Sequence, residues 1–406
     1  MSSKKIYDPI HGFIPLYSWE EQAINTLPFK RLQAIHQIGA ASSVYAGGNH
    51  KRYEHSIGTL HMVSQIYDKA LQKGESYGLP KVGSEEYYYW KKVVRLAALL
   101  HDVGHMPYSH LAEKILLDEK GHEGWTLRIL RSEYFTELFK NTDVEAEHVA
   151  KISVGPKIYE GTFTPLEFML SQMLTDDYLG GDRIDYLLRD AYYTGLAYGS
   201  FDYQQLLECI SIFPHEEQLF LGIEEDGLEA THTLLLARHF MFRRLYHYPK
   251  VKSYHFHLCR FIEKYLKDKP FNHSVEQYIR CNDYEILAEI NRALFDVNHP
   301  LRAEALCIMD QSPRYSVFGI KRNAVKKIID TLQIPIEALY VEENPLLTHQ
   351  GSPFLVLEKN GTIFDARQFV QVTAPFPNDS WMYVSPSYTK QVQACLGHGS
   401  FHSTSS

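Results

Sequence analysis

Cysteine and long apolar runs are both scarce in this chain of 406 residues. There are only five cysteines, an odd number, and no two of them have the spacing of a CxxC motif. They are too few for a disulfide framework or a thiolate zinc site, so we expect a reducing compartment. No apolar run approaches the roughly 20 residues of a membrane-spanning helix, and MSSKKIYDPIHG lacks the apolar stretch of a signal peptide. These absences predict a cytoplasmic protein with no membrane partner.

Positive charge is not in excess either. Lys and Arg total 41 against 49 for Asp and Glu, which gives a net charge of −8. A surplus of negative charge disfavours nucleic acid or anionic lipid as the main partner, because both are bound by positive surfaces. Apolar residues make up 45% and charged residues 22%, the composition of an ordinary globular protein rather than a disordered one.

Helical periodicity dominates the first three quarters of the chain. Residues 93–100 are almost continuously apolar, which indicates a helix buried on most sides. Apolar side chains also recur at helical spacing in residues 56–71 and 182–195.

The pattern changes near residue 310. Residues 314–320 predict a strand, residues 324–332 predict a short helix, and FLVLEKNGTIF predicts a hairpin. The hairpin would turn at Asn360-Gly361, because Asn-Gly tolerates the positive φ of a tight turn. We therefore predict a mainly α protein in three parts. They are a helical domain over residues 1–310, a small α/β subdomain over residues 311–393 and a flexible tail over residues 394–406.

Four potential metal ligands stand out in the helical part: His55, His101, Asp102 and Asp182. Neighbouring residues on a helix point about 100° apart, so His101 and Asp102 can reach one ion only near a helix end. Gly104 marks such an end. Two imidazoles and two carboxylates suit a divalent ion and leave positions for water and phosphate. A single buried His-Asp pair is, however, also typical of a hydrogen bond in a core.

Further histidines surround this pair. The segment HDVGHMPYSH adds His105 and His110, and Glu113 follows His110 by one helical turn. A carboxylate at that position can orient an imidazole as a proton donor or base. His122, just after a glycine, offers another acid or base, although alone it also fits a helix start. Buried histidines are rarely clustered for stability, because each must be desolvated and hydrogen-bonded. The cluster therefore predicts an active site for metal-assisted phosphoester hydrolysis.

The order of these motifs resembles a known family. RYEHSIG, LLHDVGHMPYSH and GGDRIDYLLRD follow the H…HD…D order of the HD-domain phosphohydrolases. DPIHGFI, FKRLQAIHQIG, YAGGNHKRYEHS and HEGW narrow the resemblance to the deoxynucleoside triphosphate triphosphohydrolases, the group that includes the SAM-and-HD-domain protein. The resemblance covers about residues 5–252, with no SAM-like domain ahead of it, and implies a helical HD core over about residues 50–195.

The resemblance implies a reaction and a set of roles. Family members split a dNTP into deoxynucleoside and inorganic triphosphate, with water attacking the α-phosphorus and the 5′-oxygen leaving. A divalent ion is the implied cofactor, and Mg, Mn, Fe, Co, Ni and Zn all stay open. The metal ligands implied are His55, His101, Asp102 and Asp182. The catalytic residues implied are His110 with Glu113 behind it, and His105 and His122 beside the reacting phosphate.

Substrate contacts are implied in the same way. Asp182, Tyr186 and Asp190 share one helical face because they are four residues apart. The resemblance places Tyr186 and Asp190 at the sugar 3′-hydroxyl, and Tyr246 where it would exclude the 2′-hydroxyl of a ribonucleotide. The contacts implied for sugar and base are Gln37 and Ile38, and those implied for phosphate are Arg52, Arg183 and Arg238.

Three positions depart from the family pattern. Asn25 and Gln33 stand where eukaryotic members use an Asp and an Arg to hold an activating guanine nucleotide. Their presence argues against that mode of GTP activation. Phe242 stands where the family commonly has a histidine near the phosphates, so substrate preference or rate is expected to differ.

The resemblance also implies a homo-oligomer, a dimer or tetramer, with an allosteric nucleotide between subunits. The DPIHG segment and the C-terminal α/β part are the expected interface. Two other interpretations stay open. One is another HD-type nucleotide phosphohydrolase, such as a nucleotidase or phosphodiesterase. The other is a catalytically silent nucleotide sensor or nucleic-acid-binding relative, against which the complete ligand set argues.

Overall fold

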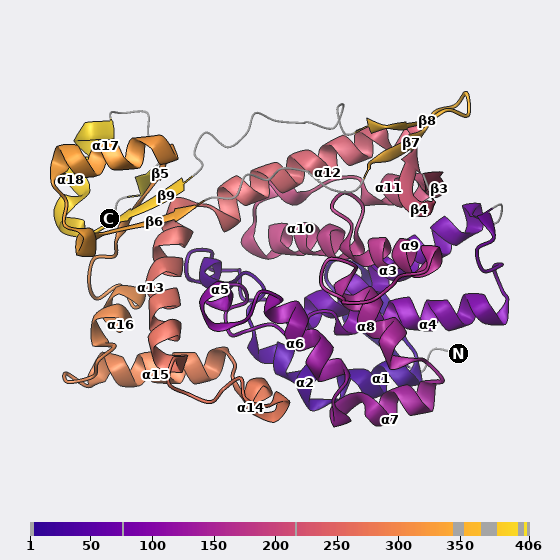
Figure 1. The fold of residues 1–406 in the computed structure, drawn as a ribbon, viewed down its shortest axis with the longest axis horizontal. Coiled ribbons are helices and arrows are strands. Elements are labelled where there is room, and N and C mark those ends of the chain that lie inside the picture. The colour runs from indigo at the N-terminus through magenta and orange to yellow at the C-terminus, as the bar shows by residue number, and fades with distance from the viewer. Residues whose placement is uncertain are drawn as a thin grey trace.

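The computed structural model describes residues 4–74, 77–215, 217–343, 353–366, 380–396 and 402–403. Helices make up most of these residues, which confirms the predicted mainly α fold (Figure 1). The helices up to residue 310 are α1 (Ser18–Ile24), α2 (Leu27–Arg31), α3 (Arg52–Lys73), α4 (Glu85–Leu100), α5 (Glu113–Leu116), α6 (Gly121–Leu130), α7 (Glu133–Thr142), α8 (Ala146–Val154), α9 (Pro165–Thr175), α10 (Gly181–Thr194), α11 (Tyr203–Cys209), α12 (Leu228–Met241), α13 (Pro249–Leu266), α14 (Val275–Arg280), α15 (Asp283–Phe295) and α16 (Arg302–Ile308). Beyond them lie α17 (Arg322–Leu332) and α18 (Thr389–Leu396).

Three long helices, α3, α4 and α10, form the centre of the helical body. Residues 93–100 of α4 are all buried, as their apolar pattern predicts. The one charged residue among them, Arg95, is neutralised by a buried ion pair with Glu20. Burying this helix on most sides fixes the position of its last turn, which leads directly to the predicted metal ligands.

An irregular path follows the end of α4. His101 and Asp102 lie just beyond the last helical residue. Gly104 packs so closely against α6 that a Cβ atom there would lie 2.1 Å from the carbonyl oxygen of His122. Tyr108 and Ser109 then adopt positive φ angles of 54° and 62°. Because the helix ends here, two adjacent side chains can face one site.

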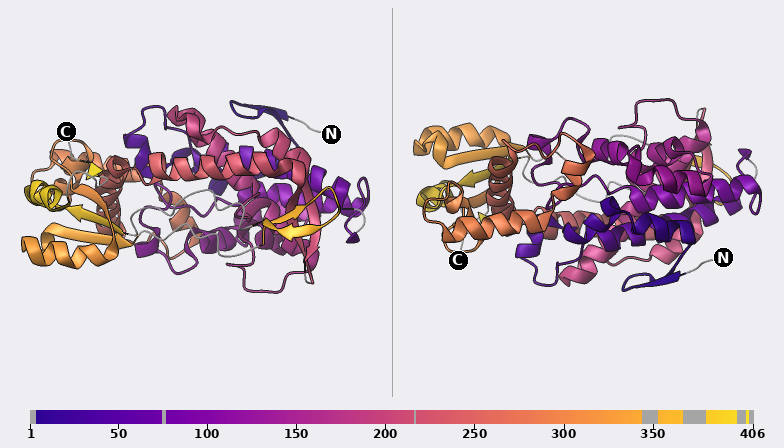
Figure 2. Two further views of the ribbon diagram at one scale, coloured as in Figure 1. Left: turned by 90° about the horizontal axis from the view of Figure 1, so that it is seen from above. Right: turned by 90° about the horizontal axis from the view of Figure 1, so that it is seen from below.

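Three small sheets complete the fold. Antiparallel β1 and β2 form an N-terminal hairpin, which stands at the edge of the helical body (Figure 2). A second sheet has the order β3-β4-β7-β8, and a third has the order β10-β5-β9-β6. The strands are β1 (Lys4–Asp8), β2 (Gly12–Leu16), β3 (Ile210–His215), β4 (Gln218–Glu224), β5 (Ser316–Ile320), β6 (Leu339–Glu343), β7 (Leu355–Leu357), β8 (Ile363–Asp365), β9 (Ser380–Val384) and β10 (His402–Ser403). The sequence patterns did not predict β1 to β4.

The C-terminal segment is divided between two sheets. The predicted strand and helix correspond to β5 and α17, and the predicted hairpin to the antiparallel pair β7 and β8. However, β7 pairs in parallel with β4, so this hairpin joins the helical body instead of the sheet of β5, β6 and β9. The reason is apolar burial, since Phe354, Val356 and Ala366 belong to the main hydrophobic core. Most of the predicted tail, residues 397–401 and 404–406, lies outside the described residues.

Within the described residues 316–343 and 380–396, the elements β5, α17, β6, β9 and α18 form a compact unit, called the C-terminal unit below. It has its own small core, which includes Phe318, Ile328 and Met382, and it lies at one end of the molecule beside α13 (Figure 1). Across the described segments, we find no helix with the length and hydropathy required to span a membrane.

Candidate active site

A cavity of about 1170 Å³ lies between the helical body and the C-terminal unit. Most of the predicted site residues line it. The exceptions are His55, Glu113, Arg183 and Arg238, and each of these contacts a residue that does line the cavity. The fold therefore brings residues from α3, α4, α10 and α12 to one place.

The four predicted metal ligands converge where α3, α4 and α10 meet; we call them the ligand cluster. His55 Nε2 lies 2.8 Å from Asp182 Oδ1 and 3.6 Å from Asp102 Oδ2. His101 Nε2 lies 3.5 Å from Asp182 Oδ1 and 3.3 Å from Asp102 Oδ1. Neither Nε2 atom has a hydrogen bond of suitable geometry. Buried imidazole nitrogens and carboxylates that face one another in this way fit a divalent ion.

The charges of the cluster favour a cation. Burial by itself would raise the pKa of both carboxyl groups. Arg52 and two histidines nevertheless hold the pKa of Asp102 well below its usual range, and His101 and His55 lower the pKa of Asp182. Burial likewise opposes a charged imidazole at His55, yet the nearby carboxylates raise its pKa to about 10. A divalent ion would supply the positive charge that these carboxylates attract.

A buried network of ion pairs lies behind the ligand cluster. His55 Nδ1 lies 2.8 Å from a carboxylate oxygen of Asp185. The Arg189 guanidinium donates one hydrogen bond to each oxygen of the same carboxylate, at 2.8 and 2.9 Å. Arg189 also donates to Asp8 at 2.8 Å, and His11 Nε2 lies 2.6 Å from Asp185. Asp8 and His11 belong to the DPIHG motif, so this network connects the N-terminal hairpin to the predicted metal ligand His55. A carboxylate behind a ligating histidine fixes its tautomer and ring orientation.

Asp185→Asn is therefore expected to weaken metal binding about 10- to 100-fold. The measurement is the Kd for Mn²⁺, determined by isothermal titration calorimetry. Glu304→Gln is a matched control, because Glu304 also holds a buried imidazole nitrogen, that of His257, at 2.7 Å but lies outside the cavity. Equal Kd values for Asp185→Asn and the unmodified protein would show that this network does not support the metal site.

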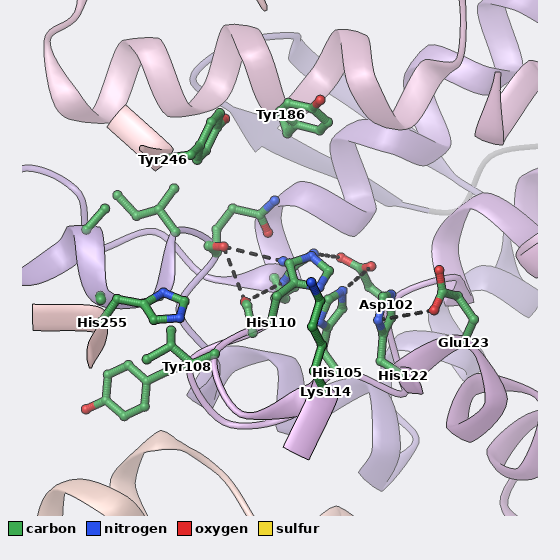
Figure 3. A pocket seen from close by; sticks show the side chains of 18 of the residues that line it. Asp102, His105, Tyr108, His110, Lys114, His122, Glu123, Tyr186, Tyr246 and His255 are labelled. Atoms are coloured by element: carbon green, nitrogen blue, oxygen red, sulfur yellow. Dashed lines mark hydrogen bonds and ion pairs between the residues drawn. The ribbon is translucent and has the colours of Figure 1, made fainter. Parts of the chain in front are cut away.

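Three histidines form a second group beside the ligand cluster. One ring nitrogen from each of His105, His110 and His122 lies within 4.8 Å of the other two, and Figure 3 shows the three rings side by side. Glu113 bridges two of them: one carboxylate oxygen lies 2.9 Å from His110 Nδ1 and the other lies 2.8 Å from His122 Nδ1. The sequence predicts only the first of these contacts. Both rings thus keep Nε2 as the nitrogen available to a substrate.

The neighbouring histidines have pKa values shifted in opposite directions. Burial opposes a charged His122, but the Glu113 carboxylate raises the pKa of this imidazole above its usual value. In turn, the two histidines lower the pKa of Glu113 in spite of its burial. His105 differs, because burial and the nearby Arg52 hold its pKa well below the usual value. One ring of the group is therefore neutral while its stacked neighbour, His122, favours the charged form.

The predicted sugar contacts gather on the side of the cavity formed by α10 and the segment after α12. Tyr246 donates a short hydrogen bond to one carboxylate oxygen of Asp190, and His50 Nε2 lies 2.7 Å from the other. The rings of Tyr186 and Tyr246 meet edge to face, with centroids 6.2 Å apart (Figure 3). His50 and Asp190 are buried, so this pair holds Asp190 in a fixed position at the cavity surface.

The three predicted phosphate-binding arginines have different partners. Arg52 donates to the predicted metal ligand Asp102 at 2.7 Å. Arg183 donates one hydrogen bond at 3.0 Å, while its Nε and Nη1 are buried and have no partner among the described residues. The Arg238 guanidinium lies 5.6 Å from the centre of the Phe242 ring, a cation–π contact that a histidine at this position would weaken when charged. The free Nε and Nη1 donors of Arg183, which lie near the cavity, are suited to bind phosphate.

Comparison with known proteins identifies the segment that carries most of the ligand cluster. Residues 52–153 match the model of the HD domain. The chain therefore contains an HD domain. The matched segment runs from α3 to α8 and includes His55, His101 and Asp102, whereas Asp182 follows on α10.

Two curated relatives align with similar shares of this chain and of their own length. The chain is 32% identical to the uncharacterized protein MJ1154 of Methanocaldococcus jannaschii over 266 residues, 66% of this chain and 51% of that one. It is 28% identical to the deoxynucleoside triphosphate triphosphohydrolase SAMHD1 homolog of Dictyostelium discoideum over 264 residues, 63% of this chain and 48% of that one. The chain thus spans about half the length of these curated relatives.

The fold is shared over a longer stretch than the sequence similarity. A solved structure of a hypothetical protein from Aquifex aeolicus is similar with a TM-score of 0.79 and 26% identity, covering 97% of this chain and 100% of that one. The C-terminal unit is therefore part of a shared fold.

Sequence patterns did not point to three residues that support this site: Asp185, His50 and His11. Asp185 follows Asp182 by three residues on α10, so helical spacing alone could have drawn attention to it. His50 precedes Arg52 by two residues, and His11 lies in a motif noted only for the resemblance. Their roles depend on contacts between distant segments, which sequence spacing does not reveal.

Proposed function

We propose that this HD-domain protein is a metal-dependent dNTP triphosphohydrolase that releases deoxynucleoside and inorganic triphosphate. The observation that carries the proposal is one cavity that joins the ligand cluster, the histidines bridged by Glu113, and a tyrosine pair suited to a deoxyribose. Relatives named as deoxynucleoside triphosphate triphosphohydrolases support the choice of substrate.

The residues around the reacting phosphate divide the chemistry between them. A divalent ion held by the ligand cluster would supply Lewis acidity at the phosphate oxygens. Arg183 and Arg238 bind phosphate oxygens and stabilise the charge of the transition state. His110, oriented by Glu113 through Nδ1, donates a proton from Nε2 to the leaving 5′-oxygen, and His122 provides a second positive charge beside it.

The sugar side explains the preference for a deoxynucleotide. Asp190, held by His50 and Tyr246, accepts a hydrogen bond from the 3′-hydroxyl. Tyr246 occupies the space next to C2′, so a ribose 2′-hydroxyl would collide with its ring. A nucleotidase for monophosphates would not need Arg183 and Arg238 together near the cavity, which favours a substrate with several phosphates.

Product analysis tests the proposal. The protein is incubated with each dNTP, with a mixture of all four, and with the corresponding ribonucleotides, in the presence of Mg²⁺, Mn²⁺ or Co²⁺. We expect deoxynucleoside and intact triphosphate from dNTPs and little turnover of ribonucleotides. Orthophosphate or pyrophosphate as the first product would contradict cleavage at the α-phosphorus. Turnover only in mixtures would indicate activation by a second nucleotide.

We further propose that the protein acts as a homo-oligomer in the cytoplasm. Tyr7 and Phe13 on the N-terminal hairpin expose 69% and 67% of their surface and pack against each other at 5.1 Å between ring centres. Exposed aromatic pairs of this kind are typical of interfaces. A double replacement by serine is expected to lower the mass measured by light scattering, and an unchanged mass would exclude this hairpin as the interface.

All five cysteines are unpaired, which agrees with a reducing compartment.

A further inference from the structure

The cavity extends well beyond the sugar and phosphate contacts. Small-molecule sites typically enclose about 300 to 1000 Å³, and this cavity is larger. Besides the predicted site residues, its lining includes His247, one face of α13, and residues of strands β6 and β9 in the C-terminal unit. We call this part the far end of the cavity; its residues are His247, Val251, Lys252, His255, Phe256, Cys259, Arg260, Glu263, Lys264, Lys267, Tyr340, Glu342, Trp381 and Tyr383.

The far end is rich in aromatic side chains. Phe256 stacks on Tyr383 with ring centres 4.8 Å apart. Lys252 Nζ lies 2.8 Å from Glu342, which also accepts a short hydrogen bond from Tyr383. The Arg260 guanidinium, 5.3 Å from the centre of the Phe256 ring, lies 2.9 Å from Glu304, so both it and Lys252 are already paired with carboxylates. The aromatic part of the far end therefore suits a flat, uncharged ring better than a phosphate.

His255 is a polar group of this end without a hydrogen bond among the described residues, as is the buried Nε1 of Trp381. Within the described residues, no hydrogen bond or ion pair engages its imidazole. In Figure 3 it lies across the cavity from Glu123, and its ring points toward the middle of the cavity. Burial and the nearby Lys252 lower its pKa to about 3, with Glu342 opposing and His247 and His110 adding smaller contributions in the same direction as Lys252. The ring is therefore neutral near pH 7.

We propose that His255 hydrogen-bonds to the edge of the substrate nucleobase and sets base preference. This inference rests on the proposed function, because it assigns the far end to the base of the same nucleotide. The phosphates are fixed at the ligand cluster and the sugar at Tyr246, so the base is directed past Tyr246. A neutral imidazole has one donor and one acceptor nitrogen. Nucleobase edges present donors and acceptors in patterns that differ between bases.

A mismatched base would leave the His255 nitrogen unpaired inside the cavity. Sites built to hydrogen-bond a substrate group discriminate strongly against analogues without it, because the buried polar group of the protein then has no partner. The C-terminal unit thereby takes part in substrate choice, since β6 and β9 close the space in which the base would lie.

His255→Phe tests this inference, because it keeps a flat ring and removes both nitrogens. We expect kcat/KM to fall about tenfold for the preferred base and to change less than about twofold for the poorest one. The loss should appear mainly in KM, since the ligand cluster and His110 are unaltered. His255→Gln, which keeps a donor and an acceptor, is expected to restore part of the preference. His232→Phe is the matched control, a half-buried histidine on α12 that does not line the cavity.

The outcomes separate the two proposals. Hydrolysis of dNTPs by the unmodified protein, with an identical base ranking in His255→Phe, would overturn the role of His255 and leave the proposed function standing. An equal loss for all four bases would also overturn it, because it would indicate a structural role. Absence of both hydrolysis and binding of every dNTP in the unmodified protein would overturn the proposed function and this inference together.

Discussion

Replacing Asp182 by asparagine is expected to lower dNTP hydrolysis by about 1000-fold or more and to remove most of the bound divalent metal. The reason is its central position: one carboxylate oxygen lies within 3.5 Å of Nε2 of both His55 and His101. The amide keeps the size of the side chain but removes the charge that holds a cation between the imidazoles. Metal content after dialysis, measured by mass spectrometry, and the rate of triphosphate release are the two measurements.

A carboxylate of similar exposure provides the control for Asp182. Asp68 on α3 has 34% of its side chain exposed, compared with 36% for Asp182, and it pairs with Lys91 away from the cavity. Asp68→Asn is therefore expected to retain metal and activity. If Asp182→Asn retained both as well, the ligand cluster would have no part in the reaction. Loss of metal with activity intact would mean that metal binding is structural.

Local patterns predict the ligand cluster because each ligand is tied to a helix with a strong signal. The apolar run at residues 93–100 requires a buried helix, and its end places His101 and Asp102 together. Helical spacing also groups Tyr186 and Asp190 with Asp182 on α10. These relations involve residues within a few turns of one another, so the sequence is sufficient to predict them.

Contacts between distant segments are not predictable in the same way. The turn at Asn360-Gly361 predicts the β7–β8 hairpin, but not that β7 pairs with β4, more than 100 residues earlier in the chain. That choice depends on the burial of Phe354 and Val356 in the main core. The same holds for Asp185, whose partner Asp8 comes from the N-terminal hairpin, and for His255, whose surroundings include strands of the C-terminal unit.

Removing the carboxylate of Glu113, which bridges His110 and His122, is the second change expected to have a large effect on the rate. Glu113→Gln is expected to lower kcat by about 100-fold, within the range that positioned acid–base groups contribute, and to leave KM nearly unchanged. Glutamine can still hydrogen-bond to one imidazole, but it cannot accept from both His110 Nδ1 and His122 Nδ1 through two charged oxygens. The orientation of the proton donor and the charge beside it are weakened together.

The pH dependence of kcat in the Glu113 variant shows whether the rate falls mainly because His122 loses its charge or because His110 loses its orientation. In the unmodified protein the carboxylate raises the pKa of His122, so this imidazole stays charged to a higher pH than a free histidine. Without the carboxylate, burial prevails and the pKa falls. The high-pH limb of the kcat profile, where the charged form is lost, is therefore expected to move to lower pH. A limb that stays in place while kcat falls would show that Glu113 acts only by orienting His110.

Glu123 offers a graded comparison at the same imidazole. Its carboxylate lies 3.4 Å from His122 Nδ1, farther than the 2.8 Å of Glu113, and the pair with Glu123 is not a hydrogen bond between the two side chains. Glu123→Gln is therefore expected to shift the high-pH limb in the same direction but by less, with less than a fivefold change in kcat. Equal effects of the two variants would mean that overall negative charge near His122, and not the bridge between two histidines, supports proton transfer.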